Sequence, residues 1–109
     1  MENSRLNQLL EYLKSSPDDS FLNFALAKEY EGLENYDLAL KHFLYIKEKN
    51  PAYIGLYYHL GQLYTLLQEE MLALDVYKEG MKLAKEQGDY HALSELNTAK
   101  TNLEITMGN

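Results

Sequence analysis

Apolar residues recur every three or four positions along most of the chain, the spacing of helices that bury one face. The first such stripe is formed by Leu6, Leu9, Leu10 and Leu13, and Pro17 then ends the helix. The chain has only two prolines and almost no β-branched runs. The pattern therefore predicts an all-α protein of about six helices, one within residues 1–19 and five near residues 20–33, 36–49, 53–67, 70–86 and 89–106.

Gly61 interrupts one of these helical segments. It stands inside YYHLGQLY, residues 57–64, where every neighbouring position suits a helix. A glycine in a helix interior costs about 1 kcal/mol relative to alanine. Some other interaction has to compensate for that cost.

The two halves of the chain match at a period of 34 residues, which accounts for this glycine. The matched pairs are Pro17 and Pro51, Leu26 and Leu60, Ala27 and Gly61, Tyr30 and Tyr64, Ala39 and Ala73, and Phe43 and Tyr77. Small side chains at a helix crossing allow the axes to approach to the short end of the usual range of about 8–10 Å. Gly61 is therefore predicted to make room for a neighbouring helix.

The period and these residues resemble the tetratricopeptide repeat family, a helix-turn-helix array with the signature W-x2-L-G-x2-Y, A-x3-F and a final proline. Residues 54–87 carry the signature in Tyr57, Leu60, Gly61, Tyr64, Ala73 and Tyr77, with Lys85 in place of the proline. Residues 20–53 carry Leu26, Ala27, Tyr30, Ala39, Phe43 and Pro51, with Asn23 in place of the large aromatic. The resemblance implies a single domain over residues 1–109: an N-terminal half-repeat helix at 1–19, repeats at 20–53 and 54–87, and a C-terminal capping helix at 88–109.

Two positions depart from a regular array. Ile46 is bulkier than its counterpart Gly80, so looser or shifted packing is expected in the first repeat.

The last helix begins like a third repeat, because Tyr90, Leu93 and Ser94 follow Tyr57, Leu60 and Gly61 at 33 residues. It then becomes two-faced, as an end cap must be: Leu93, Leu96, Ala99 and Leu103 are expected in the core, and Glu95, Thr98 and Asn102 in water. The motif tyrosines Tyr30, Tyr57, Tyr64, Tyr77 and Tyr90 are all expected to pack in the core.

Composition excludes several classes of function. The net charge is −7 and the basic residues are scattered, which disfavours a nucleic-acid partner. The chain has no cysteine, so it cannot hold thiolate metal sites or disulfides. No apolar run approaches the roughly 18 residues that span a membrane, and no signal-peptide pattern opens the chain. A cytoplasmic protein without a membrane partner is expected.

The sequence offers no catalytic or cofactor motif. Phosphate-binding loops, dinucleotide turns, zinc-protease helices and calcium loops are all missing. His42, His59 and His91 are far apart and share no helical face with a partner spaced to hold a metal. The paired acids Asp18 and Asp19 are explained by the dipole of the helix that they precede. We therefore expect no enzyme activity, no cofactor and no metal.

The family resemblance also implies a binding surface, since the first helices of successive repeats line a concave groove that holds segments of partner proteins. The matching residues here are Phe21, Phe24, Lys28, Glu31, Gly55, Tyr58, Gln62 and Thr65, with His91, Glu95 and Thr98 on the last helix. Large aromatics with polar neighbours suit a peptide. The sequence therefore predicts a non-catalytic module that binds a peptide segment of another protein.

Two other arrangements stay open. The same exposed aromatics could join identical chains into a homodimer or larger homo-oligomer, or be covered by the protein's own termini. One branch of the family grips the C-terminal carboxylate of chaperones with a lysine, an asparagine and a further asparagine. Phe24, Lys28 and His59 occupy those places here, so a clamp of that kind is not expected.

Overall fold

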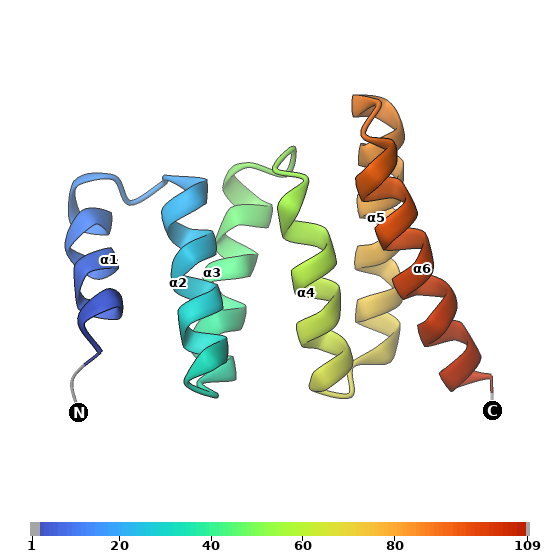
Figure 1. The fold of residues 1–109 in the computed structure, drawn as a ribbon, viewed down its shortest axis with the longest axis horizontal. Helices are drawn as coiled ribbons and strands as arrows, with labels where there is room; N and C mark the ends of the chain where they lie inside the picture. The colour runs from blue at the N-terminus through green and yellow to red at the C-terminus, as the bar shows by residue number, and fades with distance from the viewer. Residues whose placement is uncertain (1–2, 109) are drawn as a thin grey trace. The chain divides into compact units, whose positions relative to one another are not determined.

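The computed structural model describes residues 3–108, which form six α-helices and no strand. The helices are α1 (Ser4–Ser15), α2 (Ser20–Gly32), α3 (Tyr36–Lys49), α4 (Gly55–Leu66), α5 (Glu70–Gln87) and α6 (Tyr90–Met107). The predicted all-α class is confirmed: α1 lies within residues 1–19, and the other five helices begin and end within two residues of their expected bounds. The chain divides into two compact units of three helices each, one ending at Tyr53 and one beginning at Ile54 (Figure 1). That boundary coincides with the predicted junction of the repeats; the union of both units in one domain stays a prediction.

In the first unit, α2 packs against both α1 and α3. Its core contains Leu26, Ala27, Ala39 and Phe43, all without exposed surface. Ile46 is also buried, with 1% of its surface exposed, so its extra bulk is accommodated inside the unit. Polar side chains start the helices: Asn3, Asp19 and Asn35 each accept a hydrogen bond from a backbone N–H in the first turn of α1, α2 and α3.

The second unit is held together by α5, which packs against both α4 and α6. Gly61 of α4 faces the ring of Tyr77 on α5, where an added Cβ would lie 2.7 Å from Cδ1 and Cζ and nearer still to Cε1. Gly80 of α5 is equally tight, because its Cβ would lie 2.5 Å from the Cβ of Tyr57 on α4. The small residues therefore do make room for a crossing helix, as the sequence predicts for Gly61.

The link between α5 and α6 is shorter than the link between α3 and α4. After α3, Asn50 and Pro51 begin a connection that lasts until α4 starts at Gly55. At the equivalent place in the second repeat Lys85 replaces proline, so α5 continues to Gln87. Gly88 then adopts a left-handed conformation with φ of 70°, and Asp89 caps α6 at once.

The capping helix α6 buries Leu96, Ala99 and Leu103, as expected, and Leu93 is half-buried. The prediction that Tyr90 packs in the core is wrong. Its side chain is 73% exposed, because no helix of residues 3–108 covers the face of α6 on which it stands.

Candidate functional site

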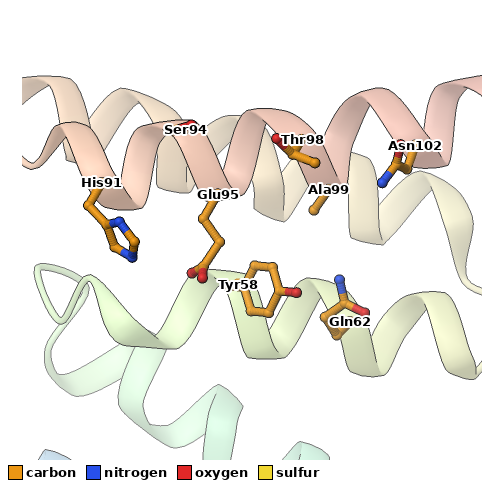
Figure 2. A pocket seen from close by; sticks show the side chains of 8 residues that line it. All are labelled: Tyr58, Gln62, His91, Ser94, Glu95, Thr98, Ala99 and Asn102. Carbon is orange, nitrogen blue, oxygen red and sulfur yellow. The ribbon is translucent and has the colours of Figure 1, made fainter.

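A cleft in the second unit brings together most of the groove residues predicted there. Tyr58 and Gln62 line it from α4, and His91, Glu95 and Thr98 line it from α6. Ser94, Ala99 and Asn102 complete its wall. The cleft has a volume of about 280 Å³, and the side chains of the two helices point toward each other across it (Figure 2).

Helical spacing explains this wall. Tyr58, Gln62 and Thr65 are separated by four and three residues, so they share one face of α4. Thr65 is not among the residues that line this cleft, and its hydroxyl donates a 2.9 Å hydrogen bond to the carbonyl of Gly61. Thr65 and Gln62 also line an adjoining cavity of about 250 Å³ together with Tyr77, Asn102 and Thr106. The two cavities share Gln62, Ala99 and Asn102, so they form one continuous surface on α4 and α6, to which α5 adds Glu70 and Tyr77.

The chemistry of this surface is mostly neutral and hydrogen-bonding. In the α4–α6 cleft, Glu95 is the one carboxylate among the lining side chains, beside hydroxyl and amide groups. At the floor of the adjoining cavity, burial raises the pKa of Tyr77 above its usual value, and a hydrogen bond with Thr65 acts in the opposite direction. The phenol therefore stays protonated and can donate a hydrogen bond.

The remaining predicted residues lie on α2, in the first unit. Phe21 is 65% exposed. The ammonium of Lys28 lies 3.1 Å from Oε1 of Glu31, an ion pair one turn long. Phe24 is half-buried and packs against two rings, edge-on to Phe43 at 5.8 Å and tilted to Tyr53 at 5.9 Å. Phe24 therefore takes part in the packing of the first unit as well as standing on the predicted groove face.

Sequence reasoning missed three members of the cleft, Ser94, Ala99 and Asn102, and one polar pair. Asn102 continues the series His91, Glu95 and Thr98 by one further turn, so extending that spacing would have found it. The polar pair is the buried Asn23 and the half-buried His42, whose Oδ1 and Nδ1 atoms lie 2.9 Å apart. Asn23 stands where the repeat signature has a large aromatic residue. No spacing rule links this position to His42, which lies on another helix.

Asn23 and His42 join three parts of the first unit. The Asn23 amide nitrogen donates to the carbonyls of Pro17 and Asp19, at 3.1 and 2.9 Å. Its oxygen therefore accepts from the Nδ1–H of His42, whose ring stacks on Tyr30 at 5.6 Å. Burial, with a smaller effect of Lys41, lowers the pKa of His42. A neutral imidazole is favoured, which matches its role as a packed hydrogen-bonding group.

Neither a metal centre nor a membrane span is found among residues 3–108. No group of three or more His, Cys, Asp or Glu side chains there could hold a metal ion. No helix in the same residues is long and apolar enough to cross a membrane.

Comparison with known proteins places the fold. A tetratricopeptide repeat domain protein from Salinibacter ruber, solved by solution NMR, is 42% identical over 82% of this chain and 90% of its own, with a TM-score of 0.78. A crystal structure of a tetratricopeptide repeat domain protein from the same organism is 42% identical over 79% of this chain and 97% of its own, with a TM-score of 0.75. The TPR2B domain of yeast Sti1, in complex with pHsp70, has the same fold at 16% identity, with a TM-score of 0.85 over 93% of this chain and 81% of its own.

No family model matches the chain, and no curated protein matches it either. The identity and coverage of the two Salinibacter ruber structures nevertheless decide the classification. The chain belongs to the tetratricopeptide repeat family.

Proposed function

We propose that this protein binds an extended segment of a partner protein in the α4–α6 cleft and catalyses no reaction. The observation that carries the proposal is the composition of the cleft: one aromatic ring, one carboxylate, and amide and hydroxyl groups on both walls. The backbone of an extended peptide presents N–H and C=O groups that need partners. Gln62 and Asn102 can each donate and accept, so they suit such a backbone.

The size and charge of the cleft narrow the ligand. A volume of about 280 Å³ is just below the roughly 300–1,000 Å³ of small-molecule pockets, and it suits one or two side chains of a peptide. Glu95 favours a basic side chain close to an apolar one that packs on Tyr58. Support for a protein partner also comes from the related fold of the yeast Sti1 domain, which was solved as a complex with pHsp70.

A library of random peptides displayed on phage, selected on the purified chain, tests this proposal. Selected peptides are expected to carry Lys or Arg beside an apolar residue. Their affinity should fall by about tenfold or more in Glu95→Arg, because a charge-assisted contact is replaced by repulsion. Glu86→Arg is the matched control, since Glu86 is exposed on α5 and does not line the cleft. Equal binding to both variants would place the peptide elsewhere.

Self-association is a second candidate, favoured by one observation. Phe21 is a large apolar side chain that is 65% exposed on α2. Light scattering on the parent chain and on Phe21→Ser distinguishes the candidates. A parent oligomer that dissociates on this substitution would support a structural homo-oligomer, whereas a monomeric parent would leave peptide binding as the function. The predicted groove residues of α2, Phe24, Lys28 and Glu31, stay a prediction.

A further inference from the structure

The face of α6 that begins with Tyr90 is open, although the matching face of α4 is covered. Tyr90, Leu93 and Ser94 repeat the pattern of Tyr57, Leu60 and Gly61. On α4 these residues are buried, with Tyr57 4% and Leu60 0% exposed. On α6 Tyr90 is 73% exposed, Leu93 is half-buried and Ser94 is exposed. The same local sequence thus has two different environments.

The helix that covers the α4 face is α5. It lies so close that an added Cβ on Gly61 would overlap the Tyr77 ring, and the Cβ of Tyr57 stands directly opposite Gly80. A large residue, a leucine and a small residue at this spacing therefore form a surface that receives another helix. Among residues 3–108, no helix occupies the equivalent place on α6.

A cleft of about 320 Å³ marks that place. One wall consists of Met81 and Lys85 of α5. The other wall belongs to α6 and consists of Tyr90, Leu93, Ser94 and Asn97. The walls are largely apolar, because they are formed by the side chain of Met81, the aliphatic part of Lys85 and the ring of Tyr90. This cleft is distinct from the α4–α6 cleft, because the two have only one lining residue, Ser94, in common.

Lys85, which lines this cleft, belongs to a row of exposed lysines on α5 that lies beside the acidic Glu79 and Glu86. Lys78, Lys82 and Lys85 are exposed and spaced by four and three residues, so they form a stripe along α5. Their ammonium groups form no ion pair with any carboxylate of residues 3–108. The chain as a whole carries a net charge of −7. An unpaired basic stripe on an acidic protein favours a ligand with a negative flank.

We propose that this cleft docks an amphipathic helix of a partner protein, which takes the position over α6 that α5 takes over α4. The docked helix presents small residues at the crossing, an aromatic side chain toward Ser94, and acidic side chains toward the lysine stripe. Its apolar face covers Tyr90 and Leu93, which removes the largest exposed aromatic of the unit from water.

A second copy of the chain fits this cleft less well. In such a dimer, α1 of the second copy would have to dock on α6 of the first. Two repeat periods separate α1 from α5, so Arg5, Leu9 and Tyr12 would take the places that Ala73, Tyr77 and Gly80 have in α5. Arg5 and Tyr12 are too large for a close crossing. Two copies joined by the same α6 face would bring their lysine stripes together, and like charges repel. The cleft therefore suits a different protein with an acidic helix.

A synthetic peptide of residues 69–87, the sequence of α5, is the probe. It carries the small and aromatic face, and Asp75, Glu79 and Glu86 give it an acidic flank. The charge control is the same peptide with D75K, E79K and E86K, which is net positive and would be drawn to an acidic chain by net charge alone. Fluorescence anisotropy of the labelled peptides with the full chain should show saturable binding of the first, and binding at least about tenfold weaker of the second.

Variants of the chain locate the binding. The double variant Tyr90→Ala with Lys85→Glu should weaken peptide binding by at least about tenfold, and both positions are exposed, so circular dichroism should show an unchanged fold. Tyr58→Ala, in the α4–α6 cleft, should bind the peptide as the parent does. The proposal would be overturned by a peptide that does not bind, by equal affinity for the double variant or for the charge-reversed peptide, or by a loss that follows Tyr58→Ala instead. Parent dimers that dissociate with Tyr90→Ala would also overturn it, in favour of a second copy.

Discussion

Replacing Gly61 by alanine tests the packing of α4 on α5 most directly. The new Cβ would lie within 2.7 Å of two carbons of the Tyr77 ring, whereas carbons in favourable contact are about 3.5–4.0 Å apart. Tyr77 is 1% exposed, so its ring has little room to move away. Alanine gains about 1 kcal/mol in helix propensity over glycine, but overpacking of this kind costs about 1–3 kcal/mol. We expect a net loss of up to about 2 kcal/mol in the free energy of unfolding, and a larger loss for Gly61→Leu.

Urea unfolding followed by far-ultraviolet circular dichroism measures this loss. Gly32→Ala is the control. Gly32 is also helical, as the last residue of α2, and an added Cβ there meets nothing within 4 Å. The control variant should be as stable as the parent or slightly more stable. The steric explanation would be refuted if Gly61→Ala changed the unfolding midpoint in the same direction and by the same amount as Gly32→Ala.

A double-mutant cycle identifies Tyr77 as the neighbour responsible. Tyr77→Leu removes the ring atoms nearest to Gly61, so Gly61→Ala should cost less in that background than in the parent. Residues in contact typically show coupling energies of about 0.5–3 kcal/mol. A coupling energy near zero would mean that the cost of Gly61→Ala arises elsewhere.

Three further predictions concern the first unit. Asn23→Ala should destabilise the protein by about 1–3 kcal/mol in urea unfolding, because it removes three part-buried hydrogen bonds; an unchanged midpoint would contradict this. Burial lowers the pKa of His42, so the unfolded chain binds more protons, and stability should be lost as the pH falls below about 6.5, the ordinary histidine pKa. His42→Gln should lose less stability over that range, and parallel pH profiles would exclude His42 as the cause. Phe24→Ala should lower the melting temperature more than Phe21→Ala, since only Phe24 packs on two other rings; equal melting temperatures would show that these ring contacts are weak.

Helices and their crossings follow from the sequence because they depend on local spacing and on residue size. The 34-residue period placed Gly61 opposite another helix, and α5 indeed meets it there. The period also placed Tyr90 in the core, which is wrong because burial requires a covering helix as well as the right residue. A motif gives the shape of a surface without saying whether another element lies on it.

The candidate site was predictable in part for the same reason. Tyr58, Gln62 and Glu95 share one cleft because each stands on the expected helix face. The pair of Asn23 and His42 was out of reach, since it replaces an apolar contact by a hydrogen bond between two helices. Phe24 shows a further limit: its place in the repeat predicts the side on which it lies, but the rings beside it determine how much of it is exposed.

The short link of Gly88 and Asp89 between α5 and α6 has a consequence for the order of folding. Two residues close this helical hairpin, and a short loop loses little entropy when its ends meet. Local contacts of this kind also favour fast folding. We therefore expect α5 and α6 to pair early in the folding of the second unit. Replacing Gly88, whose φ of 70° suits glycine, should then slow refolding in stopped-flow experiments and leave the unfolding rate nearly unchanged.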